Sequence, residues 1–265
     1  MDCNDDFEDF TMNLKTKTVL VTGASRGIGK AITLQLAKRG VQRLVLVSRN
    51  RQKLAEVASE IDYLDVEVTT LAVDLTQSVA TTIAISQAWR NYGPIDILIN
   101  CAGVAHQAPF LESKIPKMQE EVSLNLMGMF TIVRLIAKRM ATQKSGVIVN
   151  VSSLMGKVAA PTMATYSATK FAIVGFSQAL RVELAPHNIK VVALLPSLTK
   201  TDMIANLKLF RWVIPMTPES VAKSLIIGLS RDSSEILVGW QSHLAIWCQR
   251  IFPWLWERIL LMAAP

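Results

Sequence analysis

The sequence predicts an α/β protein built on one doubly wound parallel sheet with helices on both faces. Short apolar runs alternate with helical patterns from residue 17 to about residue 238. The runs are apolar throughout, which is typical of strands buried on both faces of a parallel sheet, and their number predicts about seven strands. A glycine-rich turn follows the first run directly and leads into a helix.

Each apolar run in the first half of the chain is followed by a helical pattern. The strands are expected at residues 17–21, 43–47, 66–73 and 95–100, and the helices at 28–39, 51–61 and 76–92. Gly40 ends the first helix, because glycine is favoured just past a helix C-terminus. This alternation is the pattern of βαβ units, in which helices connect parallel strands.

The second half of the chain continues the alternation. Strands are expected at residues 147–151, 190–195 and 235–238, and helices within 117–142 and at 166–185 and 219–230. Pro186 stops one of these helices and Pro218 begins another. No linker rich in Gly, Pro or Ser and no internal repeat divides the chain. With right-handed crossovers this order gives a Rossmann fold, which we expect as one domain over residues 14–240.

Composition and charge limit the classes of protein. Of 265 residues, 51% are apolar and 18% charged, which excludes intrinsic disorder. The net charge is +7, although five acids lie within the first ten residues, and we expect residues 1–13 to form a disordered extension. A basic body favours nucleic acid, nucleotide phosphates or an anionic membrane as ligands. Because no nucleic-acid recognition motif is present, we expect no nucleic-acid partner.

Cysteine and histidine positions favour neither a metal site nor a disulfide framework. Cys3, Cys101 and Cys248 lie far apart, as do the three histidines, so we expect no metal and a reducing compartment. The N-terminus is acidic and lacks an apolar run, which differs from a secretory signal. We therefore expect a cytoplasmic protein, with peripheral membrane association as a further possibility.

The glycine-rich turn predicts a site for a dinucleotide phosphate. It reads Thr22-Gly23-Ala24-Ser25-Arg26-Gly27-Ile28-Gly29. Gly23 permits the tight turn, Gly27 lets the backbone approach a pyrophosphate, and Gly29 lets the helix pack close to the strand. The ligand would meet the free N–H groups of the helix N-terminus. The alternative is a sharp turn that binds nothing, but the strand–turn–helix context favours binding.

The residues after the second strand favour NADP(H) over NAD(H). A carboxylate there would bind the ribose 2′-hydroxyl of NAD, but the residues are Ser48-Arg49-Asn50. Arg26 lies in the glycine turn itself. Two guanidinium groups near one ribose suit a 2′-phosphate, through forked, charge-assisted hydrogen bonds. The alternative is that both arginines are solvated surface charges.

A tyrosine and a lysine four positions apart predict acid–base chemistry. Tyr166 and Lys170 would lie on one face of a helix. An ammonium group close to a phenol lowers its pKa, so that the phenol can exchange a proton near neutral pH. Ser153 lies just past a strand end, at the ligand-binding edge of such a sheet. Taken alone, the Tyr-x-x-x-Lys spacing would be an ordinary surface pair.

In combination, these motifs resemble the short-chain dehydrogenase/reductase family, from about residue 17 to about residue 238. The matching elements occur in family order: Thr22 to Gly29, Asp74-Leu75, Asn100-Cys101-Ala102-Gly103, Asn125, Ser153, Tyr166, Lys170 and Pro196 to Thr201. The family usually has a second asparagine where this chain has Cys101, and a glycine where it has Ser197. We expect the first change to alter local hydrogen bonding and the second to restrict the substrate loop.

The resemblance implies a role for each matching residue. Tyr166 would give a proton to the substrate oxygen, Lys170 would lower the tyrosine pKa and hold the nicotinamide ribose, and Ser153 would stabilise the developing charge. Asn125 would hold a water that links Lys170 to solvent. The remaining cofactor contacts would come from Asp74 and Leu75 at the adenine, from Asn100, Ala102 and Gly103 in the cleft, and from Pro196 and Thr201 at the nicotinamide end.

Apolar residues dominate the region after the sixth expected strand and the C-terminal segment. Met203, Ile204, Leu207, Leu209, Phe210, Trp212, Val213, Ile214 and Met216 suit an apolar, lipid-like substrate or a lid over the core. Residues 244–264 include 16 apolar residues of 21, interrupted by Arg250, Pro253, Glu257 and Arg258. We expect residues 241–265 to cover the substrate pocket or a partner subunit, or to lie in a membrane surface.

The sequence therefore predicts an NADP(H)-dependent oxidoreductase that interconverts a ketone or aldehyde and an alcohol. We expect an apolar substrate and a homo-oligomer. The alternative is a cofactor-binding sensor or scaffold without catalysis, against which Asn125, Ser153, Tyr166 and Lys170 all argue. A 3-oxoacyl reductase, a sphingoid-base ketone reductase and a hydroxysteroid dehydrogenase are the enzyme classes considered.

Overall fold

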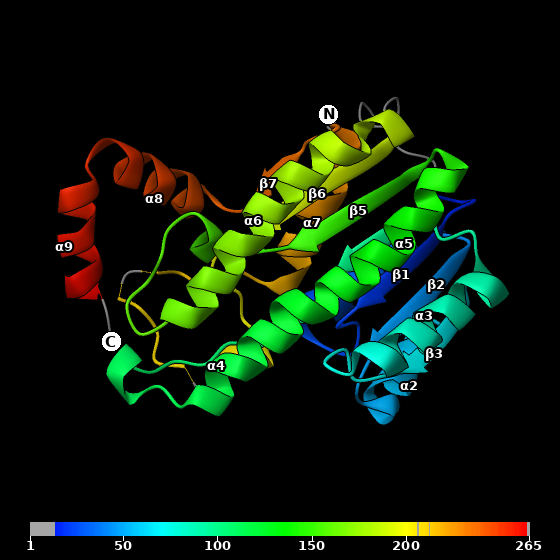
Figure 1. Cartoon of the computed structure of the whole chain (residues 1–265), viewed down its shortest axis with the longest axis horizontal. Coiled ribbons are helices and arrows are strands. Elements are labelled where there is room, and N and C mark those ends of the chain that lie inside the picture. The colour runs from blue at the N-terminus through cyan, green and yellow to red at the C-terminus, as the bar shows by residue number, and fades with distance from the viewer. Residues whose placement is uncertain (1–13, 206, 212, 264–265) are drawn as a thin grey trace, which may run out of the picture.

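The computed structural model describes residues 14–205, 207–211 and 213–263, and it confirms the predicted fold class. Seven parallel strands form one sheet in the order β3-β2-β1-β4-β5-β6-β7 (Figure 1). The strands are β1 (Thr18–Thr22), β2 (Arg43–Ser48), β3 (Glu67–Ala72), β4 (Ile97–Asn100), β5 (Gly146–Val151), β6 (Ile189–Leu195) and β7 (Glu235–Leu237). The acidic extension, Trp212 and Ala264 lie outside the described residues.

Helices cover both faces of the sheet. They are α1 (Gly27–Lys38), α2 (Arg51–Ser59), α3 (Ser78–Tyr92), α4 (Ile115–Val122), α5 (Met129–Gln143), α6 (Ala164–Leu184), α7 (Pro218–Ser230), α8 (Trp240–Ile251) and α9 (Pro253–Ala263). Buried residues of α1, α2 and α7 form one core with the sheet, and buried residues of α3, α5 and α6 form a second core on its other face. The sheet is thus enclosed from both sides.

The apolar strand sequences follow from this enclosure. In β1, Val19 and Val21 belong to the first core, whereas Leu20, between them, belongs to the second. All three side chains are fully buried. Because successive side chains point to opposite faces of a sheet, a strand between two cores must be apolar at every position.

The long helix expected within residues 117–142 is interrupted. Helix α4 runs into a π-helical turn at Ser123–Gly128, and α5 begins only at Met129. Gly128 lies against the loop after β3, where an added Cβ would be 2.9 Å from the carbonyl oxygen of Leu75. The wider turn contains Asn125, which is 1% exposed. Such π-helical turns often occur at functional sites.

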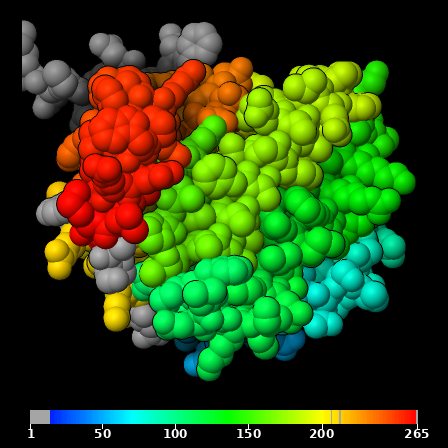
Figure 2. Space-filling model, turned by 60° about the vertical axis from the view of Figure 1, so that its left-hand side comes forward, coloured from blue at the N-terminus to red at the C-terminus, as the bar shows by residue number. Residues whose placement is uncertain are grey.

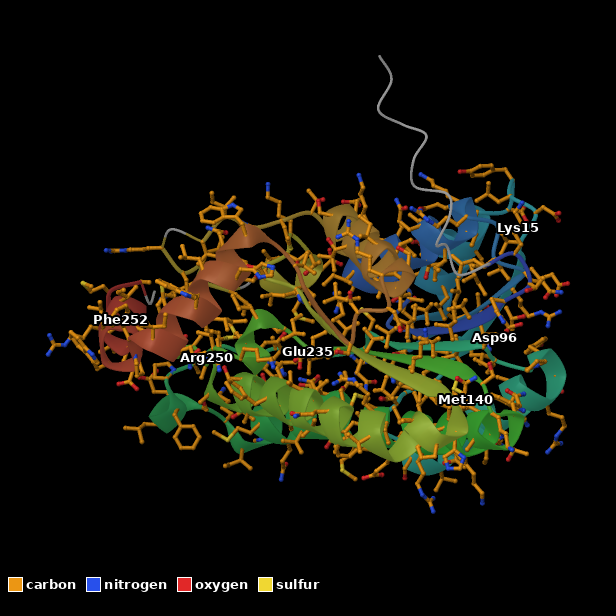
Figure 3. All side chains as sticks on the ribbon, turned by 90° about the horizontal axis from the view of Figure 1, so that it is seen from above. Lys15, Asp96, Met140, Glu235, Arg250 and Phe252 are labelled. Carbon is orange, nitrogen blue, oxygen red and sulfur yellow. The ribbon has the colours of Figure 1, made fainter. Side chains whose placement is uncertain are left out.

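The C-terminal segment forms two helices rather than one. The backbone N–H of Phe252 still bonds to the carbonyl of Cys248, and α9 then starts at Pro253, a residue suited to a first helical turn. Among the described residues, no helix combines the length and the apolar content that crossing a membrane requires. Figure 3 places Arg250 and Phe252 of this segment at the opposite end of the molecule from Lys15 and Asp96.

Candidate active site

A cavity of about 670 Å³ opens at the carboxyl edge of the sheet. The loops after β1, β2, β4, β5 and β6 contribute to its wall, and α8 and α9 close it from the other side. Strand order reverses between β1 and β4, which is where open α/β sheets bind their ligands. The predicted residues on its wall are Gly23, Ser25, Arg26, Gly27, Ile28, Gly29, Ser48, Arg49, Leu75, Ala102, Gly103, Ser153, Tyr166, Lys170, Pro196 and Thr201.

Four predicted residues do not line the cavity, and two of them support the loop after β4. The hydroxyl oxygen of Thr22 accepts the backbone N–H groups of Cys101 at 3.0 Å and Ala102 at 3.2 Å. The Asn100 amide donates to the side-chain oxygen of Asn150 at 2.9 Å, within the sheet. These hydrogen bonds hold the loop after β4 in place beside the cavity.

The other two, Asn125 and Asp74, also hold backbone. The Asn125 side chain accepts the N–H of Val104 at 2.9 Å and donates to the carbonyl of the same residue at 2.9 Å. Its oxygen lies close to the cavity, since a Cβ added to Gly103 would be 3.1 Å from that oxygen and 3.7 Å from Lys170 Nζ. Asp74 accepts the backbone N–H and the hydroxyl of Thr76, at 3.0 and 2.9 Å.

The glycine turn brings the start of α1 against the β4 loop. Gly23 has φ +67°, and a Cβ there would lie 2.9 Å from the Cα of Ala102. A Cβ on Gly29 would lie 2.3 Å from the carbonyl oxygen of Gly23, so close helix packing requires glycine. In the described structure, no side chain caps the first turn of α1. Its free N–H groups can therefore bind an anion.

Positive side chains converge beside this turn, and one of them was missed by the sequence analysis. Asp202 Oδ2 lies 3.4 Å from Arg26 Nη1 and 3.9 Å from Lys53 Nζ, so both cations reach the same point. Ser25 and Ser48 hydrogen-bond to each other at 2.8 Å nearby. Lys53 lies in the first turn of α2, and only the fold brings it near Arg26. The arrangement can hold a phosphate group.

Tyr166 and Lys170 project from one face of α6 into the cavity. Lys170 Nζ lies 5.5 Å from the centre of the Tyr166 ring and donates to the carbonyl oxygen of Val151 at 3.0 Å. Burial lowers the pKa of Lys170 to about 8. Ser153 lies at the end of β5, and its hydrogen bond to Tyr166 lowers the tyrosine pKa. The three groups are thus brought together, as the sequence predicts.

The pKa of Tyr166 differs from the expectation that Lys170 lowers it. Burial raises the pKa of Tyr166 to about 12, and this effect exceeds the opposing hydrogen bond from Ser153. Negative charge on Glu121, and on Cys101 once its thiol ionises, raises the pKa further. The reason is that a buried phenolate loses its hydration, which costs more than the serine hydrogen bond recovers. At neutral pH the phenol therefore keeps its proton and can act as a proton donor.

Glu121 is a second group that the sequence analysis missed. Its side chain is only 2% exposed, and its carboxylate accepts the backbone N–H of His106 at 2.7 Å. Burial raises its pKa. Glu121 lies one helical turn before Asn125, and both side chains hold the loop after β4. Glu121 directly follows another glutamate, Glu120, so its sequence gives no signal of burial. Burial also raises the pKa of the Cys101 thiol to about 12, which leaves it unreactive.

The far side of the cavity is mainly apolar. Its wall includes Met203, Ile204, Leu207, Phe210 and Val213 from the loop after β6. Five residues of α8 and four of α9 join them, mostly at spacings of three and four. They are Trp240, Gln241, Leu244, Ala245 and Cys248, then Trp256, Ile259, Leu260 and Ala263. One face of each helix therefore lines the cavity. This end can accept an apolar molecule.

The loop that carries these apolar side chains is fixed to α8 and α9. The backbone N–H of Arg211 donates to the carbonyl of Ala263 at 2.9 Å, and that of Ile214 donates to the Gln241 side chain at 3.3 Å. Of the other residues expected to meet a substrate, Leu209 and Ile214 point to solvent, and Met216 packs against the first core.

Known proteins resemble this chain in sequence and in fold. A 3-oxoacyl-[acyl-carrier-protein] reductase of Staphylococcus aureus is 33% identical over 188 residues, 71% of this chain and 76% of that protein. A 3alpha-hydroxysteroid dehydrogenase of Mediterraneibacter gnavus is 34% identical over 217 residues, 81% and 82% of the two chains. A short chain dehydrogenase from Burkholderia cenocepacia, solved in complex with NADP, has a TM-score of 0.82 and 26% sequence identity. The match covers 94% of this chain and 99% of that one.

The family model described as short chain dehydrogenase matches residues 17–211. This span runs from the start of β1 to the loop that carries the apolar cavity wall, and it includes the phosphate turn, Ser153, Tyr166 and Lys170. The chain therefore belongs to the short-chain dehydrogenase family.

Proposed function

We propose that the protein is an NADP(H)-dependent oxidoreductase that interconverts a ketone or aldehyde and an alcohol. The observation that carries the proposal is the joint placement of Ser153, Tyr166 and Lys170 in the cavity that also begins at the phosphate turn. One end of the cavity is suited to a dinucleotide, the middle to proton transfer and the far end to an apolar group.

The residues present fit the cofactor. The uncapped first turn of α1 suits the pyrophosphate, and Gly23 and Gly29 allow the close approach that this requires. Arg26 and Lys53 converge on one carboxylate oxygen, in the place that a 2′-phosphate would take. Arg49 is exposed on the same wall. The cofactor supplies or accepts the hydride when bound. The NADP in the related Burkholderia structure supports this assignment.

Tyr166 acts in this proposal as the general acid of reduction. Its phenol is protonated at neutral pH, because burial raises its pKa to about 12. It would give its proton to the substrate oxygen as negative charge develops there. Ser153 donates a hydrogen bond at the same point and stabilises that charge. Lys170, whose pKa burial lowers to about 8, then returns a proton towards Tyr166. Asn125 keeps Val104 and the adjoining Gly103 in place beside Lys170.

The substrate is proposed to be apolar and lipid-like. The loop after β6 and the inner faces of α8 and α9 offer mainly aliphatic and aromatic side chains to the cavity. An acyl chain or a steroid would fill such a wall, and relatives named for both classes match this chain. Homo-oligomerisation and peripheral membrane contact belong to the same proposal, and the membrane contact alone is assigned to residues 241–265. Light scattering of the purified protein measures the first.

The experiment that tests the proposal is a carbonyl screen with NADPH. Medium- and long-chain ketones, 3-oxoacyl thioesters and 3-ketosteroids are each incubated with the enzyme, and cofactor oxidation and alcohol formation are both measured. The expected result is NADPH oxidation that depends on an apolar carbonyl and yields the alcohol in equal amount. NADPH binding without turnover across the panel would favour a cofactor-binding sensor or scaffold instead.

A further inference from the structure

Helices α8 and α9 carry large apolar side chains on their outer surface as well as on the face that lines the cavity. We call the exposed set that does not line the cavity the outer face, and its members are Trp247, Ile251, Phe252, Trp254, Leu255, Leu261 and Met262. Figure 2 shows the two helices at the surface, with their outer side open to solvent. A surface helix normally turns a polar face outward, so apolar side chains here indicate a binding surface.

The inner and outer side chains are distinct sets on the same helices. Trp247 is 57% exposed and Trp254 is 62% exposed, and neither lines the cavity. Arg258 stands over the Trp254 ring at 5.9 Å from its centre, one turn further along α9. Leu261 continues this stripe at 71% exposure. The outer face can therefore bind a surface while the inner face holds a substrate.

The outer face continues onto neighbouring loops. Leu209 and Ile214 are exposed in the loop that is bonded to α9 through Arg211. That loop joins the segment after β4, because the Gln107 side chain exchanges two hydrogen bonds with the Lys208 backbone, at 2.7 and 3.0 Å. Three further exposed apolar side chains follow in that segment: Phe110, Leu111 and Ile115. One end of the molecule is thus apolar around the cavity.

The charges at this end are mainly positive. Residues 110–115, 207–211 and 240–263 contain five basic side chains, Lys114, Lys208, Arg211, Arg250 and Arg258, and two acidic ones, Glu112 and Glu257. Tryptophan and aliphatic side chains interspersed with arginine are typical of surfaces that lie in the interface of an anionic bilayer. A two-fold contact with a second copy would place these like charges against one another, which disfavours that occupant.

We propose that the outer face docks on an anionic lipid bilayer, and that the apolar substrate passes from the bilayer into the cavity between α8–α9 and the loop after β6. This inference rests on the proposed function for the identity of the reaction. The bilayer contact itself depends only on the outer face. Because the inner faces of the same helices line the cavity, docking would bring the cavity next to the lipid that holds the substrate.

The test is flotation of the full chain with vesicles. Phosphatidylcholine vesicles are compared with vesicles that also contain phosphatidylglycerol, at low and high salt. The variant carries Trp247→Ser and Trp254→Ser. The matched control carries Tyr63→Ser and Val79→Ser, which are 74% and 73% exposed on distant elements. We expect the wild type and the control to bind the anionic vesicles. The affinity of the tryptophan variant for these vesicles should be lower by about ten-fold or more.

Two further measurements distinguish a loss of membrane docking from misfolding and from a loss of catalysis. NADPH affinity and turnover of a short, water-soluble ketone should be unchanged in the tryptophan variant, whereas turnover of a long-chain ketone held in vesicles should fall. Equal vesicle binding by the tryptophan variant, or absence of binding by the wild type, overturns the proposal. The proposal is also overturned if the wild type is a dimer that does not bind vesicles and if the two tryptophan substitutions dissociate this dimer. A Tyr166→Phe protein should still float, so failure of the proposed reaction is detected separately.

Discussion

Replacing Asp202 with asparagine is expected to tighten the binding of NADPH and to leave the binding of NADH unchanged. Asp202 Oδ2 lies 3.4 Å from Arg26 and 3.9 Å from Lys53, so its carboxylate competes with the 2′-phosphate for both cations. The carboxylate is 58% exposed and solvent screens both pairs. Exposed ion pairs contribute about 0.2–1 kcal/mol each. Freeing two cations therefore predicts a gain of about two- to thirty-fold in NADPH affinity.

The assay is a fluorescence titration of the protein with each cofactor. Asp232→Asn is the matched control, because Asp232 pairs with Lys190 at a distant surface and loses the same charge. The reverse change, Lys53→Gln, should weaken NADPH binding by a similar factor, whereas Arg51→Gln on the same helix should not. An Asp202→Asn protein that binds NADPH no better, or that gains equally for NADH, would refute a phosphate site between Arg26 and Lys53.

Three further outcomes are expected. The rate of NADPH-dependent reduction should fall as the pH rises through about 8, where Lys170 loses its charge, and a profile that stays flat through that pH contradicts its role. Glu121→Gln removes a charge that raises the pKa of Tyr166, so the pH profile of alcohol oxidation should move to lower pH. An unchanged profile would argue against electrostatic coupling between Glu121 and Tyr166. Gly29→Ala places a Cβ 2.3 Å from the carbonyl oxygen of Gly23 and should lower the free energy of unfolding by about 1–3 kcal/mol. In the control Gly175→Ala, the added Cβ meets no neighbouring segment within 4 Å among the described residues, so the melting temperature should not fall.

The strands were predictable because their burial on two sides leaves a plain record in the sequence. Leu20 and its two neighbours belong to different cores, so the three central positions of β1 had to be apolar. The phosphate turn was predictable for a similar reason, since Gly23 and Gly29 are required by close backbone contacts. In both cases a local geometric constraint fixes the residue type.

The remaining features depend on contacts between distant segments. Lys53 and Asp202 are remote in sequence, and only the fold brings them to Arg26. Glu121 resembles any surface glutamate until the loop at His106 covers it. The sequence also could not divide cavity-wall residues from those that do not line the cavity. Thr22 and Asn125 turned out to hydrogen-bond backbone of the β4 loop, which depends on the π-helical turn and on loop packing.

In the proposed reaction, Tyr166 donates the proton in an NADPH-dependent carbonyl reduction. The most direct measurement is turnover of Tyr166→Phe with the best ketone from the screen, together with its NADPH affinity. Phenylalanine keeps the ring beside Lys170 and removes only the hydroxyl. We expect an NADPH affinity close to that of the wild type and a fall in kcat of about 10²-fold or more, the range that a positioned general acid provides. Full turnover in the Tyr166→Phe protein would contradict proton donation by Tyr166.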